Sequence, residues 1–158
     1  MWINRFTTIT QNMRSNIILF ILAALAWSGG KTIHTDTEWK DMMGQDRYNV
    51  MRRRATERAF LGKYVLTQSK GTYYCAGCLL ALFSSEDKYQ AKVGWPTFTQ
   101  PIAPKNVFYL EDLSMGFKRY EVLCQQCDSH LGHVFHDGPP IKHLRYCINS
   151  ISLQFEPN

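Results

Sequence analysis

Two short stretches decide the fold of this chain: CAGC at residues 75–78 and CQQC at residues 124–127. Each places two cysteines three positions apart, which is the usual half of a tetrahedral site with thiolate ligands. Each pair also follows a strand-like segment, so both can lie on tight turns and face a common centre. We therefore expect one structural zinc ion with four ligands: Cys75, Cys78, Cys124 and Cys127.

Two disulfides are the main alternative to a metal, and they gain weight if the protein is exported, because disulfides persist in oxidising compartments. A redox Cys-x-x-Cys is a further alternative, although neither pair resembles one that opens a helix after a strand. The identical spacing of the two pairs favours zinc. Because 45 residues separate the pairs, the metal would join distant parts of the chain.

Two short helices are expected before residue 60. The first has Thr37 as its N-cap and three apolar residues spaced for one face: Trp39, Met42 and Met43. The second covers residues 46–54 and buries Tyr48 and Met51. Beyond residue 60 the segments are short, β-branched or aromatic: residues 63–66, 72–75, 119–123 and 144–155. This order predicts an α+β domain dominated by antiparallel sheet.

Cys147 is the fifth cysteine and lies in the strand-like segment RYCIN, residues 145–149. Alternate side chains of a strand share a face, so Arg145, Cys147 and Asn149 are expected to point one way. A guanidinium beside a thiol favours the nucleophilic thiolate. Asn149 can orient a water molecule or a polar group of a substrate. A buried structural cysteine is the alternative.

The segment HLGHVFH, residues 130–136, supplies acids and bases. An imidazole can protonate a reacting oxygen near neutral pH, which makes His130 and His133 candidates. A helical metal site is the alternative, but Gly132 and the following residues 137–140 argue against a helix there. Trp95, in the rigid turn at 94–98, is either core or an apolar wall for a methylthio group.

The chain from about residue 48 to 155 resembles the methionine-R-sulfoxide reductases (MsrB). Six stretches are similar to the family pattern: TERAF (56–60), GTYYCAGC (71–78), GWPTF (94–98), CQQC (124–127), HLGHVF (130–135) and RYCINS (145–150). The resemblance implies two antiparallel sheets with short peripheral helices and a structural zinc on the four paired cysteines. It also implies reduction of the R epimer of methionine sulfoxide, free or in proteins.

The resemblance implies a role for each matching residue. Cys147 attacks the sulfoxide sulfur and becomes a sulfenic acid, while His130 and His133 hold and protonate the oxygen. Asn149 and Arg145 are polar neighbours, and Trp95 forms the methyl pocket. The chain departs from the family at three places: Val93 stands where many members have a cysteine, and residues 91–92 and 141–143 also differ.

Counting cysteines predicts how the enzyme is reset. With four bound to zinc, Cys147 has no second thiol on its own chain, so the reductant is thioredoxin or a small thiol. A non-catalytic zinc-binding interaction module of the same fold is the rival function, and it would have no use for the segments around His133 and Cys147. An unrelated thiol enzyme with a structural zinc is a weaker rival.

The whole chain has room for one domain, and its charge and N-terminus bear on partners and location. The 158 residues carry a net charge of +5, and the only tight basic cluster, residues 52–54, indicates a solvated helix end, so we expect no nucleic-acid partner. We also expect a monomer. No acidic residue precedes Asp36, and an apolar run at 17–27 follows two arginines. These features predict a signal peptide (1–26), a linker (27–36), the reductase domain (37–158), and a periplasmic or secreted protein. An uncleaved membrane anchor or an organellar presequence are the alternatives.

Overall fold

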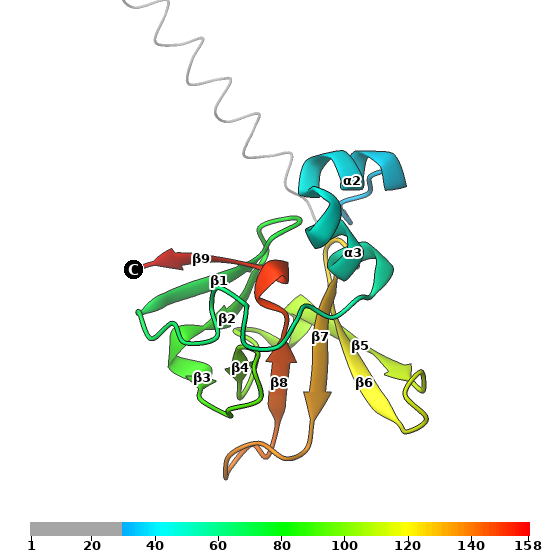
Figure 1. The fold of residues 1–158 in the computed structure, drawn as a ribbon. Helices are drawn as coiled ribbons and strands as arrows, with labels where there is room; N and C mark the ends of the chain where they lie inside the picture. The colour runs from blue at the N-terminus through cyan, green and yellow to red at the C-terminus, as the bar shows by residue number, and fades with distance from the viewer. Residues whose placement is uncertain (1–29) are drawn as a thin grey trace, which may run out of the picture. The chain divides into compact units, whose positions relative to one another are not determined.

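The computed structural model describes residues 30–158, which form two antiparallel sheets and two short helices (Figure 1). Helices α2 (Asp36–Met43) and α3 (Gln45–Arg53) precede every strand. The smaller sheet has the order β2-β1-β9, formed by Ala81–Ser84, Gly71–Cys75 and Leu153–Pro157. The larger sheet has the order β3-β4-β8-β7-β6-β5, formed by Lys88–Tyr89, Thr97–Phe98, Arg145–Ile148, His130–Phe135, Arg119–Cys124 and Val107–Asp112. All strand pairs are antiparallel, which confirms the predicted fold class.

The N-cap of helix α2 is Thr35, which forms a capping box, and not Thr37 as predicted. Thr35 is the N-cap: its hydroxyl accepts a hydrogen bond from the Glu38 amide, and the Glu38 carboxylate accepts one from the Thr35 amide. The prediction of Thr37 was wrong because only the residue three positions before Glu38 can close this reciprocal pair. Trp39 is buried as expected, whereas Met42 is 58% exposed.

Helix α3 buries Tyr48 and Met51, as the sequence predicted. It begins and ends one residue earlier than the predicted range 46–54. The backbone of Arg54 adopts a left-handed conformation and its amide donates to the Asn49 carbonyl, which closes the helix.

Residues 63–66 form turns and no strand, contrary to the prediction. Their backbone groups are satisfied by partners other than a neighbouring strand. The Val65 amide donates to the Gly62 carbonyl, the Tyr64 amide donates to the Ser150 hydroxyl, and the Lys88 ammonium donates to the Val65 carbonyl. Tyr64 is buried, so the apolar pattern of this segment reflects packing of one ring rather than sheet pairing.

The hydrophobic core is built from aromatic rings of both sheets. Phe83 of β2 stacks on Phe98 of β4 with ring centroids 4.5 Å apart, and Tyr73 of β1 meets Phe98 edge-on at 5.1 Å. Tyr146 of β8 lies 5.8 Å from Phe83. All four rings are buried, and burial of such a side chain stabilises a fold by about 1.5–3 kcal/mol.

The predicted segment 144–155 is two strands in different sheets. Strand β8 lies between β4 and β7 in the larger sheet, and β9 pairs with β1 in the smaller one (Figure 1). A short 3₁₀ helix, η3 (Ser150–Ser152), joins them. Cys147 therefore lies immediately before the point where the chain leaves one sheet for the other.

The predicted signal peptide lies outside the described residues. From residue 30 onward, no helix has the length and apolar character needed to cross a membrane. Two residues of the predicted linker contact the second cysteine turn: Lys31 forms a 2.7 Å ion pair with Asp128, and the Thr32 amide donates to the Gln126 carbonyl.

Candidate active site and metal centre

The free thiol of Cys147 lies in a row of side chains that crosses the larger sheet. Thr97 of β4 lies opposite Cys147 of β8. Cys147 in turn lies opposite His133 of β7. Residues directly opposite in antiparallel strands point to the same face. Tyr146 and Ile148, the neighbours of Cys147 in β8, are buried and point into the core. The thiol and the imidazole therefore share the opposite face of the sheet.

Gly132 allows β7 and β8 to approach closely beside the thiol. A Cβ atom at this position would overlap the Cys147 carbonyl oxygen and come within 2.9 Å of the Ile148 Cα. The segment 130–135 is a strand, as Gly132 and its neighbours indicated, and not a helix carrying a metal. The glycine therefore keeps His133 and Cys147 in register.

A cavity of about 110 Å³ opens beside the thiol. It is lined by eight residues: Thr56, Trp95, Arg119, Gly132, His133, Phe135, Cys147 and Asn149. This volume is well below the roughly 300 Å³ at which sites for whole small molecules begin, so it suits the end of a side chain. Larger hollows of about 640 and 420 Å³ lie elsewhere, and the thiol lines neither.

The structure therefore brings four of the predicted site residues together around one cavity, namely Trp95, His133, Cys147 and Asn149. His130 and Arg145 do not line it. His130 is 2% exposed and lines the 420 Å³ hollow instead. Its Nδ1 donates to Glu121 Oε1 at 2.7 Å, and its ring meets His133 edge-on at 5.5 Å. His130 therefore packs against the His133 ring and does not face the cavity as one of its lining residues.

Burial raises the pKa of the Cys147 thiol to about 11. The Arg145 guanidinium acts in the opposite direction, as the sequence predicted, but does not overcome burial. Arg145 also forms a two-pronged ion pair with Asp137, with both nitrogen–oxygen distances 2.8 Å, and lies over the Phe135 ring. The carboxylates of Asp137 and Glu57 raise the thiol pKa further.

His133 is held by two residues that the sequence analysis did not identify. Its Nε2 donates to Asp112 Oδ2 at 2.7 Å, and the same oxygen accepts from the Arg119 guanidinium at 2.6 Å. Burial lowers the pKa of His133, and the hydrogen bond to Asp112 raises it. Arg119 lines the cavity, and its buried Nε has no hydrogen-bond partner within residues 30–158. The opposite charges of Asp112 and Arg119, facing each other across the β5–β6 hairpin, were the missed signal.

Asn149 and Trp95 are both fixed by Glu57. The Glu57 amide donates to Asn149 Oδ1 at 3.1 Å, and the Trp95 indole donates to the Glu57 carbonyl at 3.1 Å. Asn149 Nδ2 donates to the Leu131 carbonyl at 3.1 Å. The sequence identified residues 56–60 only as part of a family pattern and indicated no role for Glu57.

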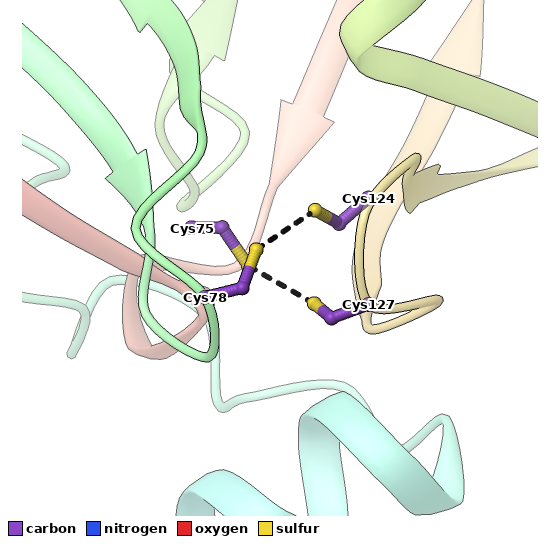
Figure 2. A group of neighbouring side chains, drawn as sticks. All are labelled: Cys75, Cys78, Cys124 and Cys127. Carbon is purple, nitrogen blue, oxygen red and sulfur yellow. Dashed lines mark hydrogen bonds between the residues drawn. The ribbon is translucent and has the colours of Figure 1, made fainter. Parts of the chain in front are cut away.

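The four paired cysteines converge from two turns, one after β1 and the other after β6 (Figure 2). Their four sulfurs all lie within 4.8 Å of one another. Cys75 and Cys127 are 3.6 Å apart, and Cys78 and Cys124 are 3.5 Å apart. A tetrahedral zinc with sulfur ligands at about 2.3 Å places neighbouring sulfurs about 3.8 Å apart. The donor set and spacing therefore fit a closed zinc site.

Comparisons with known proteins agree with this geometry. The SelR domain family model matches residues 43–157. A protein of Azotobacter vinelandii named "Peptide methionine sulfoxide reductase MsrB" is 49% identical over 119 residues, which cover 75% of this chain and 90% of the relative. A protein of the same name from Leptospira interrogans is 48% identical over 122 residues, covering 77% and 93%. A solved Mis18 "Yippee-like" domain aligns over 56% of this chain and 97% of its own, with a TM-score of 0.46 and 16% identity, values too low to support an inference.

Proposed function

The chain belongs to the SelR-domain family of peptide methionine sulfoxide reductases, MsrB, and from this premise we propose that it reduces methionine-R-sulfoxide with Cys147 as the nucleophile. The enzyme is a thiol-dependent oxidoreductase. The observation that carries the assignment of Cys147 is its position opposite His133, on a cavity that Trp95 also lines. The R epimer is the expectation for the family.

The reaction transfers one oxygen atom and two electrons. The Cys147 sulfur attacks the sulfoxide sulfur, and the sulfoxide oxygen leaves for the cysteine sulfur, which yields methionine and a cysteine sulfenic acid. His133 donates a proton to the oxygen as negative charge develops and recovers it from the thiol. The Arg119 cation, at the edge of the cavity, stabilises the same developing charge.

Trp95 and Asn149 bind and orient the substrate, and Arg145 acts on the thiol. Trp95 provides an apolar face for the methyl group attached to sulfur. Asn149 offers an amide N–H beside the thiol, because only one of its two Nδ2 hydrogens is needed for the Leu131 carbonyl. Arg145 lowers the pKa of Cys147 and favours the attacking thiolate.

We propose zinc as the occupant of the cysteine cluster. Cys75, Cys78, Cys124 and Cys127 would hold it as thiolates, and it would stabilise the fold by joining two distant turns. Four protein ligands leave no open position for a substrate, so the chemistry remains with Cys147.

The sulfenic acid is reset by a thiol from outside the chain. The four other cysteines converge on the candidate metal site. Val93 stands where many family members have a cysteine, so that position offers no second thiol either. One external thiol condenses with the sulfenic acid and releases water, and a second thiol then cleaves the mixed disulfide. We propose thioredoxin or a small thiol as this reductant.

The decisive experiment offers separate R and S epimers of a methionine sulfoxide peptide with dithiothreitol as reductant. We expect turnover of the R epimer alone. The Cys147→Ser variant should retain zinc and the fold and lose all turnover. After a single turnover without reductant, a dione reagent should trap one sulfenic acid per chain. No turnover of either epimer would contradict the function and return weight to a non-catalytic zinc module.

A further inference from the structure

Glu57 lies in a segment that forms part of the wall of the active-site cavity. Residues 53–58 are exposed apart from Glu57, whose side chain turns inward. Its neighbour Thr56 lines the cavity, and the Phe60 amide donates to the Gly94 carbonyl at 2.8 Å. The segment therefore contributes Thr56 to the cavity wall and is joined to the Trp95 turn through Phe60.

Every hydrogen-bonding group of Glu57 is used on residues at or next to the site. Its amide binds Asn149, and its carbonyl binds the Trp95 indole, each at 3.1 Å. Its carboxylate accepts from the Ser150 amide through Oε1 and from the Ile151 amide through Oε2, the latter at 3.0 Å. Those two amides immediately follow Asn149, so the carboxylate holds the backbone that carries it.

We propose that Glu57 is a positioning residue of this reductase, which holds the Trp95 ring and the Asn149 amide in register across the cavity. The inference rests on the proposed function for its kinetic consequences only. Trp95 is 38 residues and Asn149 is 92 residues from Glu57 along the chain. Glu57 therefore links two segments that are far apart in sequence. Fixing both groups in advance reduces the ordering needed when a substrate enters.

Glu57 also acts on the nucleophile through its charge. The charged groups that act on the Cys147 thiol are Arg145, which lowers its pKa, and Asp137 and Glu57, which raise it. The carboxylate of Glu57 therefore has two separable effects. Its oxygens hold the backbone amides, and its charge opposes ionisation of the thiol.

The test compares Glu57→Ala and Glu57→Gln with Glu86→Gln, a matched control that removes one negative charge at an exposed position. We expect kcat/KM for the R-sulfoxide to fall at least tenfold in Glu57→Ala. Glu57→Gln should recover to within about threefold of the wild type, because its amide oxygen still accepts one backbone hydrogen bond. The control should be unchanged.

Alkylation of Cys147 as a function of pH separates positioning from general loss of structure. The thiol pKa should fall by a similar amount in Glu57→Gln and Glu57→Ala, because both remove the same charge. The proposal is overturned if the thiol pKa of Glu57→Gln returns to the wild-type value together with its kcat/KM. It is also overturned if kcat/KM in Glu57→Ala stays within twofold of the wild type.

Hydrogen exchange measured by NMR tests the contacts without activity. In the wild type, the Trp95 indole and the amides of Ser150 and Ile151 should be protected. The two amides lose their acceptor in Glu57→Ala and should exchange at least tenfold faster. The indole keeps its main-chain acceptor and should exchange faster to a smaller extent, because the carboxylate no longer anchors that main chain. Fast exchange of the indole in the wild type would overturn the proposal even if both variants fail to fold. If the wild type reduces neither epimer, the proposed function fails, while these exchange rates still decide the role of Glu57.

Discussion

The buried thiol leads to a quantitative expectation for its reactivity. With a pKa of about 11, only about one Cys147 in 10⁴ is ionised at pH 7, and about one in 10² at pH 9. Because the thiolate is the nucleophile, the rate of alkylation should rise about tenfold per pH unit and about 100-fold between pH 7 and pH 9. The increase should level off only near pH 11.

The assay is alkylation of the resting, zinc-loaded protein by iodoacetamide, followed by intact mass. Cys147→Ser provides the background from the four clustered cysteines. Arg145→Met should slow the reaction at every pH below the plateau, because the guanidinium lowers the thiol pKa. A plateau below pH 9 in the wild type would refute the reasoning, since it would mean that Arg145 outweighs burial.

Three further expectations follow from the same geometry. Gly132→Ala should destabilise the protein by roughly 1–3 kcal/mol and impair turnover, because the new Cβ overlaps the Cys147 carbonyl; unchanged thermal unfolding and activity would contradict this. Asp112→Asn should lower the pKa of His133 and move the alkaline limb of the kcat profile to lower pH, because the carboxylate favours the charged imidazole that donates the proton; NMR titration of His133 measures it, and an unshifted curve would remove Asp112 from this role. Removal of zinc by a chelator should release about one ion per chain and unfold the domain; a metal-free, folded protein with two disulfides by mass would exclude the zinc site.

Local patterns in the sequence were sufficient for the main elements around the site. The four paired cysteines lie together as predicted, and the spacing within each pair indicated this because it places both thiols of a pair on one tight turn. The alternation in residues 145–148 correctly placed Tyr146 and Ile148 in the core, because a strand has a period of two. Gly132 correctly argued against a helix at 130–135.

Other local patterns were misleading because a competing interaction won. Residues 63–66 have the composition of a strand, but they form turns, and their backbone groups bond to a turn and to side chains. Thr37 has N-cap chemistry, but Thr35 has the partner Glu38 three residues later. In each case the residue type was compatible with the prediction and the available partner decided against it.

By itself the sequence indicated the nucleophile candidate, the candidate metal-binding cysteines and the strand that carries Cys147, because each is marked by a short local motif. Only the tertiary structure decided which groups surround the thiol. Glu57 reaches Asn149 across 92 residues, and His133 reaches Asp112 across 21. The thiol pKa of about 11 was likewise invisible in the sequence, because burial is the sum of contacts from strands that meet only in the folded sheet.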